Sequence, residues 1–205
     1  MATINHTTIN VKFIKGVNVK TSTIKTKLER AKKKAFDNFM QNFRDHAITR
    51  EIVAGRHGSN TSGTLGGYGN LFSFIGFDEG DNPAQVIETY ILNKLRKSIR
   101  LTPNTRQGGW KATFDLPSIE EIAALTPMPW AGGRSWVMGI HEGISGLGQY
   151  MYSTRASRYG SRSGTAFQTD TSLRGGGFRN VPYMVPLLKA LQKNLNEQIR
   201  IMVRS

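Results

Sequence analysis

The stretch with the clearest potential for ligand chemistry is HGSNTSGTLGGYGNLFSFIGF, residues 57–77. Glycine-rich turns that lead into a helix or strand often hold phosphates. A Walker A loop requires GxxxxGK[ST], and no glycine of this chain precedes Lys-Ser or Lys-Thr. A dinucleotide fingerprint, GxGxxG, begins at Gly67 and Gly69 but has a phenylalanine at position 72. Neither pattern is complete, so we do not expect a phosphate site here.

Residues suited to nucleophilic or metal chemistry are also poorly spaced. The GxSxG nucleophile pattern is narrowly missed at residues 143–146 and 160–164. His141-Glu142 could form an acid–base pair, although such a dipeptide is more often polar surface. The histidines lack the HxH or HxxxH spacing that favours metal binding; they are His6, His46, His57 and His141. The chain contains no cysteine. We therefore expect no catalytic residues, no cofactor, no metal and no small-molecule substrate, and hence not an enzyme.

Two groups of cationic residues could contact an anionic partner. One is RASRYGSR, residues 155–162, in which arginines alternate with an aromatic residue, as in flexible segments that bind phosphates and stack on bases. The other is a run of three lysines on one predicted helical turn. The candidate DNA or anionic-partner contacts are Lys32, Lys33, Lys34, Arg155, Arg158 and Arg162. No recognised nucleic-acid-binding motif is present. Solvation of a Gly/Ser loop, or pairing with an acidic neighbouring subunit, explains the arginines at least as well.

The net charge of the 205-residue chain is +14, and it is unevenly distributed. Residues 1–50 have eleven Lys and Arg against three acids, and residues 155–205 have nine against two. The segment 51–154 between them has eight against nine. This asymmetry suggests contact with nucleic acid or an acidic protein surface. No apolar run is long enough to span a membrane, and the N-terminus does not resemble a signal peptide.

Apolar periodicity predicts the elements that position these residues. The first half reads as a strand or hairpin within 8–20, a helix of about twenty residues from an N-cap at Ser22, an extended piece over 48–53 and a helix over 83–97. The second half reads as a hairpin over 98–102 and 109–116, a short helix after Ser118, a strand over 134–140, a long Gly/Arg-rich loop over about 143–177 and a helix over about 186–203. The prediction is one α+β domain, 1–205, with an N-terminal strand or arm, 1–21, and amphipathic helices near both ends packed on a mainly antiparallel sheet.

The apolar half of the opening stretch, Leu71 to Phe77, reads as a strand covered on both faces. A single domain of this size could supply that cover alone, or a ring subunit could obtain it from a neighbour. Long loops in compact domains are often ordered by partners. The candidate subunit-interface residues are Leu71, Phe72, Phe74, Phe77, Tyr150, Tyr152 and Phe167.

The order of these elements resembles the neck or tail-completion proteins of tailed bacteriophages, which join head and tail. A basic helix leads to SGTLGGYGNLFSFIGF, then to strands and to a closing helix, PYMVPLLKALQKNLNEQI. The turn from Asn60 to Leu65 is similar to the family's TG-L-S-type turn. Pro182-Tyr183 and the later Pro186 are similar to its closing RPF-L-P-AL element. GRSWVMGIHEGISGLGQYMY and SRSGTAFQ give a general impression of phage virion proteins. The 143–177 loop departs from the compact family pattern.

The resemblance implies a structural virion protein, made in the host cytoplasm. It would form a homo-oligomeric ring of six or twelve copies between the portal or connector and the tail, at the neck, tail-completion or tail-terminator position. Its partners would be neighbouring connector and tail proteins, with DNA in the channel and no membrane. The alternative is a small basic nucleic-acid-binding protein without catalytic activity.

Overall fold

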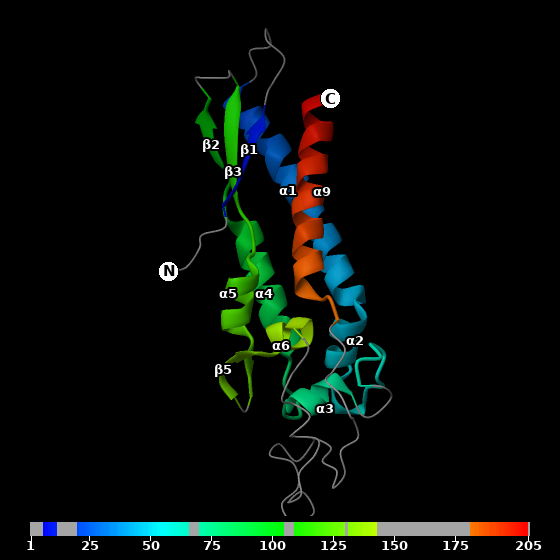
Figure 1. The fold of residues 1–205 in the computed structure, drawn as a ribbon. Coiled ribbons are helices and arrows are strands. Elements are labelled where there is room, and N and C mark those ends of the chain that lie inside the picture. The colour runs from blue at the N-terminus through cyan, green and yellow to red at the C-terminus, as the bar shows by residue number, and fades with distance from the viewer. Residues whose placement is uncertain are drawn as a thin grey trace, which may run out of the picture. The chain divides into compact units, whose positions relative to one another are not determined.

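The computed structural model describes residues 6–11, 20–65, 70–104, 109–129, 131–142 and 181–204. The fold is α+β, as predicted, with amphipathic helices near both ends and antiparallel sheets (Figure 1). The predicted loop of residues 143–177 lies outside the described residues, as does most of the predicted N-terminal arm.

The chain divides into two compact units. Unit 1 comprises Met1–Asn42, Thr89–Ser118 and Leu187–Ser205. Unit 2 comprises Phe43–Glu88 and Ile119–Pro186. Three helices contribute residues to both units; they are α1 (Thr21–Asp45), α4 (Pro83–Arg96) and α9 (Met184–Arg204).

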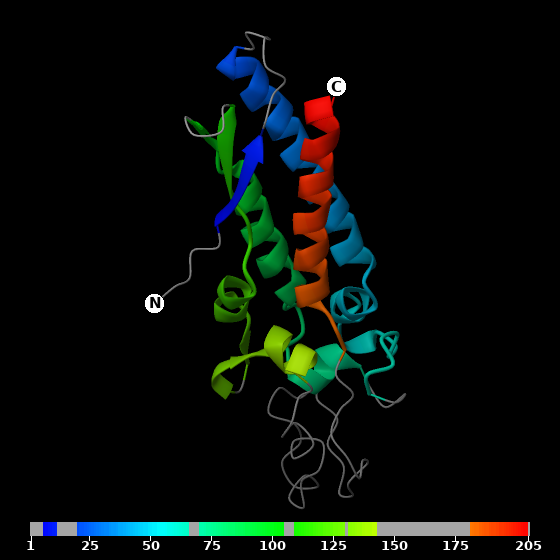
Figure 2. The same ribbon diagram turned by 45° about the horizontal axis from the view of Figure 1, so that its top comes forward.

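Unit 1 contains a three-stranded antiparallel sheet in the order β1-β3-β2 (Figure 2). The strands are β1 (His6–Val11), β2 (Arg100–Pro103) and β3 (Trp110–Asp115). In the register, Val11 lies opposite Trp110, and Arg100 lies opposite Thr113. The predicted hairpin is therefore confirmed as β2–β3. Alternation along β3 buries Ala112 and Phe114, so one face of this strand packs into the unit 1 core.

The long helices bury the apolar stripes that the sequence predicts. On the unit 1 part of α1 these include Ile24, Leu28, Ala31, Ala35 and Phe39, and on that of α9 Leu187, Leu191, Leu195 and Ile199. Helix α4 begins at Pro83, and the backbone N–H of Gln85 donates to Asn82 Oδ1 at 3.2 Å. This is the predicted combination of an Asx N-cap with proline at the first helical position.

Unit 2 is built from short elements. They are α2 (Ala47–Val53), the 3-10 helix Gly55–His57, α3 (Leu71–Ile75), α5 (Ile119–Leu125), β4 (Pro127–Met128), β5 (Ala131–Ser135) and α6 (Trp136–Glu142). The strands β4 and β5 pair antiparallel. Helix α5 begins directly after Ser118, where the capping box predicted a helix.

The predicted strand at the end of the glycine-rich stretch is wrong, because Leu71–Ile75 is the helix α3. Asn70 caps it by accepting from the backbone N–H of Ser73 at 2.9 Å. Gly76 ends it in the left-handed conformation, at φ 88°, which glycine adopts without strain. All five helical residues are buried, so alternation and helical periodicity could not be distinguished there.

The predicted extended segments at 48–53 and 134–140 also contain helices. Helix α2 starts after His46, whose Nδ1 accepts from the backbone N–H of Ile48 at 3.3 Å. At 134–140 only the first two residues belong to β5, and α6 follows, with Ser135 Oγ accepting from the backbone N–H of Met138 at 3.2 Å. In both helices a capping side chain determines where the helix begins. The alternation of apolar residues does not indicate such a cap.

Aromatic side chains form the centre of the unit 2 core. The Phe77 ring meets Trp136 edge-on at 5.8 Å between centroids, and Trp136 lies 6.4 Å from Tyr183. Phe43 stacks on Tyr183 at 6.3 Å. The Tyr183 and Thr49 hydroxyls share a 2.8 Å hydrogen bond, and burial raises the pKa of the Tyr183 hydroxyl. Tyr183, at the start of the closing segment, is thereby fixed inside unit 2.

Candidate functional site: a cationic surface on unit 1

The positive charge of the chain belongs to unit 1. This unit has 19 Lys and Arg against 4 Asp and Glu, a net charge of +15. Unit 2 has 9 Lys and Arg against 10 Asp and Glu, a net charge of −1. All 13 lysines are in unit 1, and every cation of unit 2 is an arginine. Unit 1 is therefore the part of the chain that attracts an anionic partner.

The predicted lysine run on α1 is only partly available. Lys32 is 4% exposed; its Nζ lies 2.7 Å from a Glu29 carboxylate oxygen and donates to the carbonyl of Lys97 at 2.6 Å. Lys32 is therefore wrong as a partner contact, because its charge is buried and neutralised within unit 1. Lys33 is exposed and pairs with Asp37 at 2.7 Å, an exposed pair that solvent screens.

Two rows of exposed cations have no carboxylate partner among the residues that the structure describes. Their members are Arg30 and Lys34 on α1, and Lys189, Lys193 and Arg200 on α9. The α9 residues are four and seven positions apart, so they lie on one side of the helix. The α9 row is not among the contacts predicted from the sequence, although its spacing within a predicted helix is a signal that the sequence contains.

The other predicted contacts either lie in the core or outside the described residues. Leu71, Phe72, Phe74 and Phe77 are 1%, 2%, 7% and 5% exposed within the chain itself. The rings of Phe72 and Phe77 lie 5.4 Å apart. These four residues are core residues of unit 2 rather than the contact surface that the sequence suggested. The remaining candidates lie outside the described residues; they are Tyr150, Tyr152, Phe167, Arg155, Arg158 and Arg162.

A buried carboxylate of the chain itself, that of Glu51, holds the glycine-rich stretch. Glu51 is fully buried and accepts three hydrogen bonds. The donors are Asn60 Nδ2 at 2.8 Å, the backbone N–H of Ser62 at 2.8 Å and that of Leu71 at 2.7 Å. Asn70 adds two bonds from its amide, to the carbonyls of Arg56 and Gly58. The Glu51 carboxylate thus accepts hydrogen bonds of the kind that a phosphate accepts in a nucleotide-binding loop. This agrees with the incomplete nucleotide-binding motifs of the stretch.

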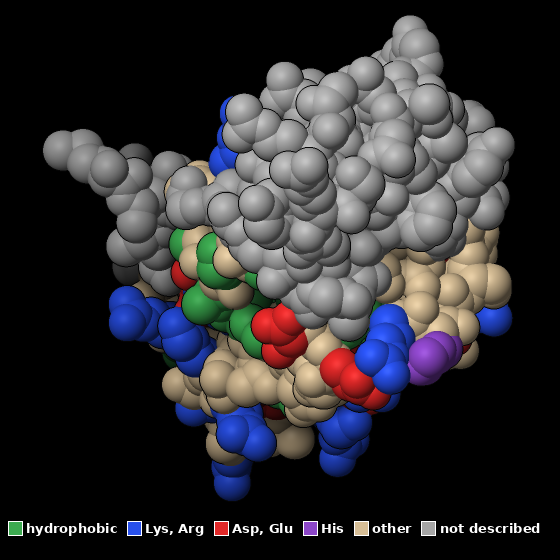
Figure 3. Space-filling view, turned by 90° about the horizontal axis from the view of Figure 1, so that it is seen from below, with side chains coloured by type: hydrophobic (Ala, Val, Ile, Leu, Met, Phe, Trp, Pro, Cys, Tyr) green, Lys and Arg blue, Asp and Glu red, His purple; other side chains and the backbone are tan. Residues whose placement is uncertain are grey.

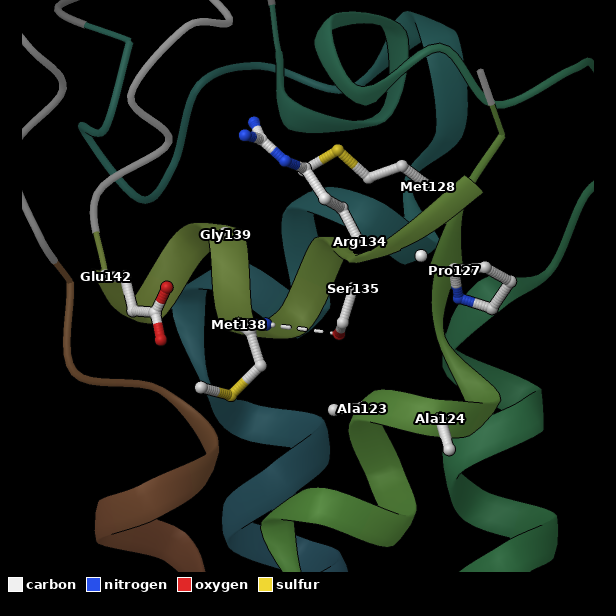
Figure 4. A pocket seen from close by; sticks show the side chains of 10 residues that line it. Ala123, Ala124, Pro127, Met128, Arg134, Ser135, Met138, Gly139 and Glu142 are labelled. Carbon is white, nitrogen blue, oxygen red and sulfur yellow. Dashed lines mark hydrogen bonds between the residues drawn. The ribbon is translucent and has the colours of Figure 1, made fainter. Parts of the chain in front are cut away.

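A shallow groove of about 570 Å³ lies within unit 2 (Figure 4). Small residues of α5 and α6, with two methionines, form much of its lining, and Arg134 and Glu142 are its charged members. On the face of the molecule seen in Figure 3, hydrophobic side chains reach the surface in one small area beside acidic side chains. The groove contains no buried charged group that would select a ligand.

In the part of the chain that the structure describes, no group of three or more His, Cys, Asp or Glu residues could hold a metal ion. Burial lowers the pKa of the His46 imidazole, opposed by a hydrogen bond to the backbone of Pro182. Among the described residues, His141 Nδ1 is buried without a partner, while Glu142 is exposed.

None of the described helices is both long enough and apolar enough to cross a membrane. No protein-family model, curated protein or solved structure matches this chain.

Proposed function

We propose that the protein is a structural virion subunit of a tailed bacteriophage that forms a ring in the neck or tail-completion assembly. The observation that supports this most is the order of elements in the resemblance. A basic amphipathic helix, the NTSGTL turn and a proline-marked closing helix follow one another along the chain. The helices α1 and α9 occupy the two places that the resemblance assigns to long helices.

The charge difference between the units supports a role in assembly. In a ring, each subunit contacts its neighbour through two different surfaces. A chain whose two units differ in charge therefore favours this head-to-tail contact over a symmetric dimer in which identical surfaces meet. Unit 2 has nine Lys and Arg against ten Asp and Glu, so it is close to neutral. Unit 1 is strongly basic, with nineteen against four.

Negative-stain electron microscopy and sedimentation velocity of the purified full chain test the proposal. We expect closed rings of six or twelve copies, with one dominant sedimenting species. Because subunits of charge +14 repel one another, added salt should favour ring formation by screening. A monomer or dimer at every salt and protein concentration, without rings, would contradict the proposal.

A further inference from the structure

The exposed row on α9 consists of Lys189, Lys193 and Arg200. Residues four and eleven positions apart in an α-helix fall within about 40° of one another around the axis. The row therefore runs for about 16 Å along one side of α9. The only acidic residue of the helix, Glu197, forms no ion pair with these cations among the described residues.

A second group of cations lies on α1, which runs beside α9 within unit 1 in both ribbon views (Figures 1 and 2). Arg30 and Lys34 are exposed and four positions apart, so they share the outer side of α1. The two acidic residues near them on the helix, Glu29 and Asp37, are already paired with Lys32 and Lys33. No carboxylate among the described residues of unit 1 forms an ion pair with either exposed row.

The chemistry of these rows matches a polyanion better than a second copy of the chain. A copy presents a near-neutral unit 2 and a strongly basic unit 1, and its net charge of +14 repels at long range. A nucleic-acid strand has phosphates at a regular short repeat, which a line of cations along a helix can contact in succession. An isolated small anion would meet only one or two of the five cations.

We propose that unit 1 binds the phosphate backbone of nucleic acid through Lys189, Lys193 and Arg200 on α9, with Arg30 and Lys34 on α1. Phosphate contacts of this kind position a protein on nucleic acid and contribute no sequence preference. The inference goes beyond the assembly role, because it assigns a ligand that the subunit binds whether or not it is in a ring.

The test compares two double variants of the full chain that lose the same charge. K193Q/R200Q removes two cations of the α9 row, and R50Q/R134Q removes two exposed arginines of unit 2. Glutamine keeps helix propensity close to that of lysine and arginine. Anisotropy of a labelled random-sequence DNA duplex of about 30 base pairs, measured at about 50–300 mM NaCl, gives affinity and salt slope.

For K193Q/R200Q we expect roughly tenfold weaker binding at about 150 mM salt and a log–log salt slope smaller by about two. R50Q/R134Q should stay within about twofold of the unsubstituted chain. Equal weakening of both variants would overturn the site, because net charge alone would then explain binding. Absence of binding by the unsubstituted chain at about 50 mM salt would overturn it as well.

Sedimentation of the same samples separates this inference from the assembly proposal. Rings that do not bind the duplex contradict the phosphate site and leave the proposed ring role standing. Duplex binding by a monomer that never forms rings supports the site and contradicts the ring role.

Discussion

Unit 2 pairs two of its four described cations with its own carboxylates, whereas unit 1 has many more cations than carboxylates. In unit 2, Arg44 binds Glu88 through Nε and Nη2 at 2.8 and 3.1 Å, and Arg56 pairs with Glu79 at 2.6 Å. In unit 1, 19 Lys and Arg share 4 Asp and Glu, so most cations cannot be paired internally. The difference separates charge that is paired within the fold from charge that remains for a partner.

Within unit 1, two of the four carboxylates, Glu29 and Asp115, contact a buried lysine. Asp115 contacts two lysines, Lys94 at 2.9 Å and Lys97 at 2.6 Å. The Lys94 side chain is only 8% exposed. An ammonium group buried to this extent requires a nearby anion, while the exposed cations of α9 do not.

The largest predicted effect is the loss of the Glu51 carboxylate in unit 2. Glu51→Gln should lower the free energy of unfolding by about 3 kcal/mol, because three donors would face an amide that cannot accept them all. Urea denaturation measures the change. The matched control is Glu79→Gln, whose carboxylate is 65% exposed and which should change stability by less than about 0.5 kcal/mol. Equal effects of the two variants would refute the role assigned to Glu51.

The next effect concerns the buried pair of unit 1. Asp115→Asn should cost about 2 kcal/mol, because the Lys94 ammonium would lose its carboxylate in a buried position. The exposed pair of Lys33 and Asp37 supplies the control, and Asp37→Asn should be nearly neutral. Thermal unfolding of both variants measures the two losses of stability. A neutral Asp115→Asn would show that Lys94 does not depend on this carboxylate.

Acid should weaken both units, through different groups. The hydrogen bonds and charges of Lys97 and Lys94 outweigh burial and lower the pKa of Asp115. Its contribution to stability is therefore complete above the ordinary value of 3.8 and is lost as the pH falls through the lowered folded-state pKa. Asp115→Asn should remove this part of the acid transition in a urea–pH series.

His46 makes the stability of unit 2 depend on pH, more weakly and at higher pH than Asp115 does in unit 1. Burial lowers its folded-state pKa, so the unfolded chain binds the proton more readily. Stability should be full above about 6.5 and should fall as the pH drops below that value, with a slope of at most about 1.4 kcal/mol per pH unit. His46→Asn keeps an N-cap acceptor but does not titrate, and it should flatten the slope between about pH 7 and 5. An unchanged slope would assign the dependence to another group.

The smallest expected effect on stability is that of the α9 row. K193Q/R200Q should alter the free energy of unfolding by less than about 0.5 kcal/mol, because both side chains are exposed. Chemical denaturation at low and moderate salt measures it. A loss above about 1.5 kcal/mol would mean that these cations stabilise the fold and are not held free for a ligand.

Sequence patterns predicted the long elements better than the short ones. Helices α1, α4 and α9 have apolar stripes of several turns, and packing of such stripes dominates their stability. Helices α2, α3 and α6 have five to seven residues and are set by single capping side chains at His46, Asn70 and Ser135. A short buried run offers too few turns to reveal its period.

The sequence predicted that the candidate site would be positively charged, but it did not predict which cations would form it. The excess of cations at both ends of the chain was visible in the sequence, and the outermost segments, 1–42 and 187–205, both belong to unit 1. That unit also takes six cations from the middle segment 89–118, whereas the five arginines of 155–179 belong to unit 2. The burial of Lys32 could have been inferred, since it lies four residues from the core residues Leu28 and Phe36. The Glu51 contacts to Asn60, Ser62 and Leu71 depend on tertiary folding, so no local pattern reports them.

The most direct test of the account is arginine modification of the full chain with phenylglyoxal, with and without duplex DNA, read by mass spectrometry. Arginine is the only cation present in both units, so one reagent reports on each. We predict protection of Arg30 and Arg200 in unit 1 and unchanged modification of Arg50 and Arg134 in unit 2. Protection of Arg50 and Arg134 with free reaction at Arg30 and Arg200 would contradict it.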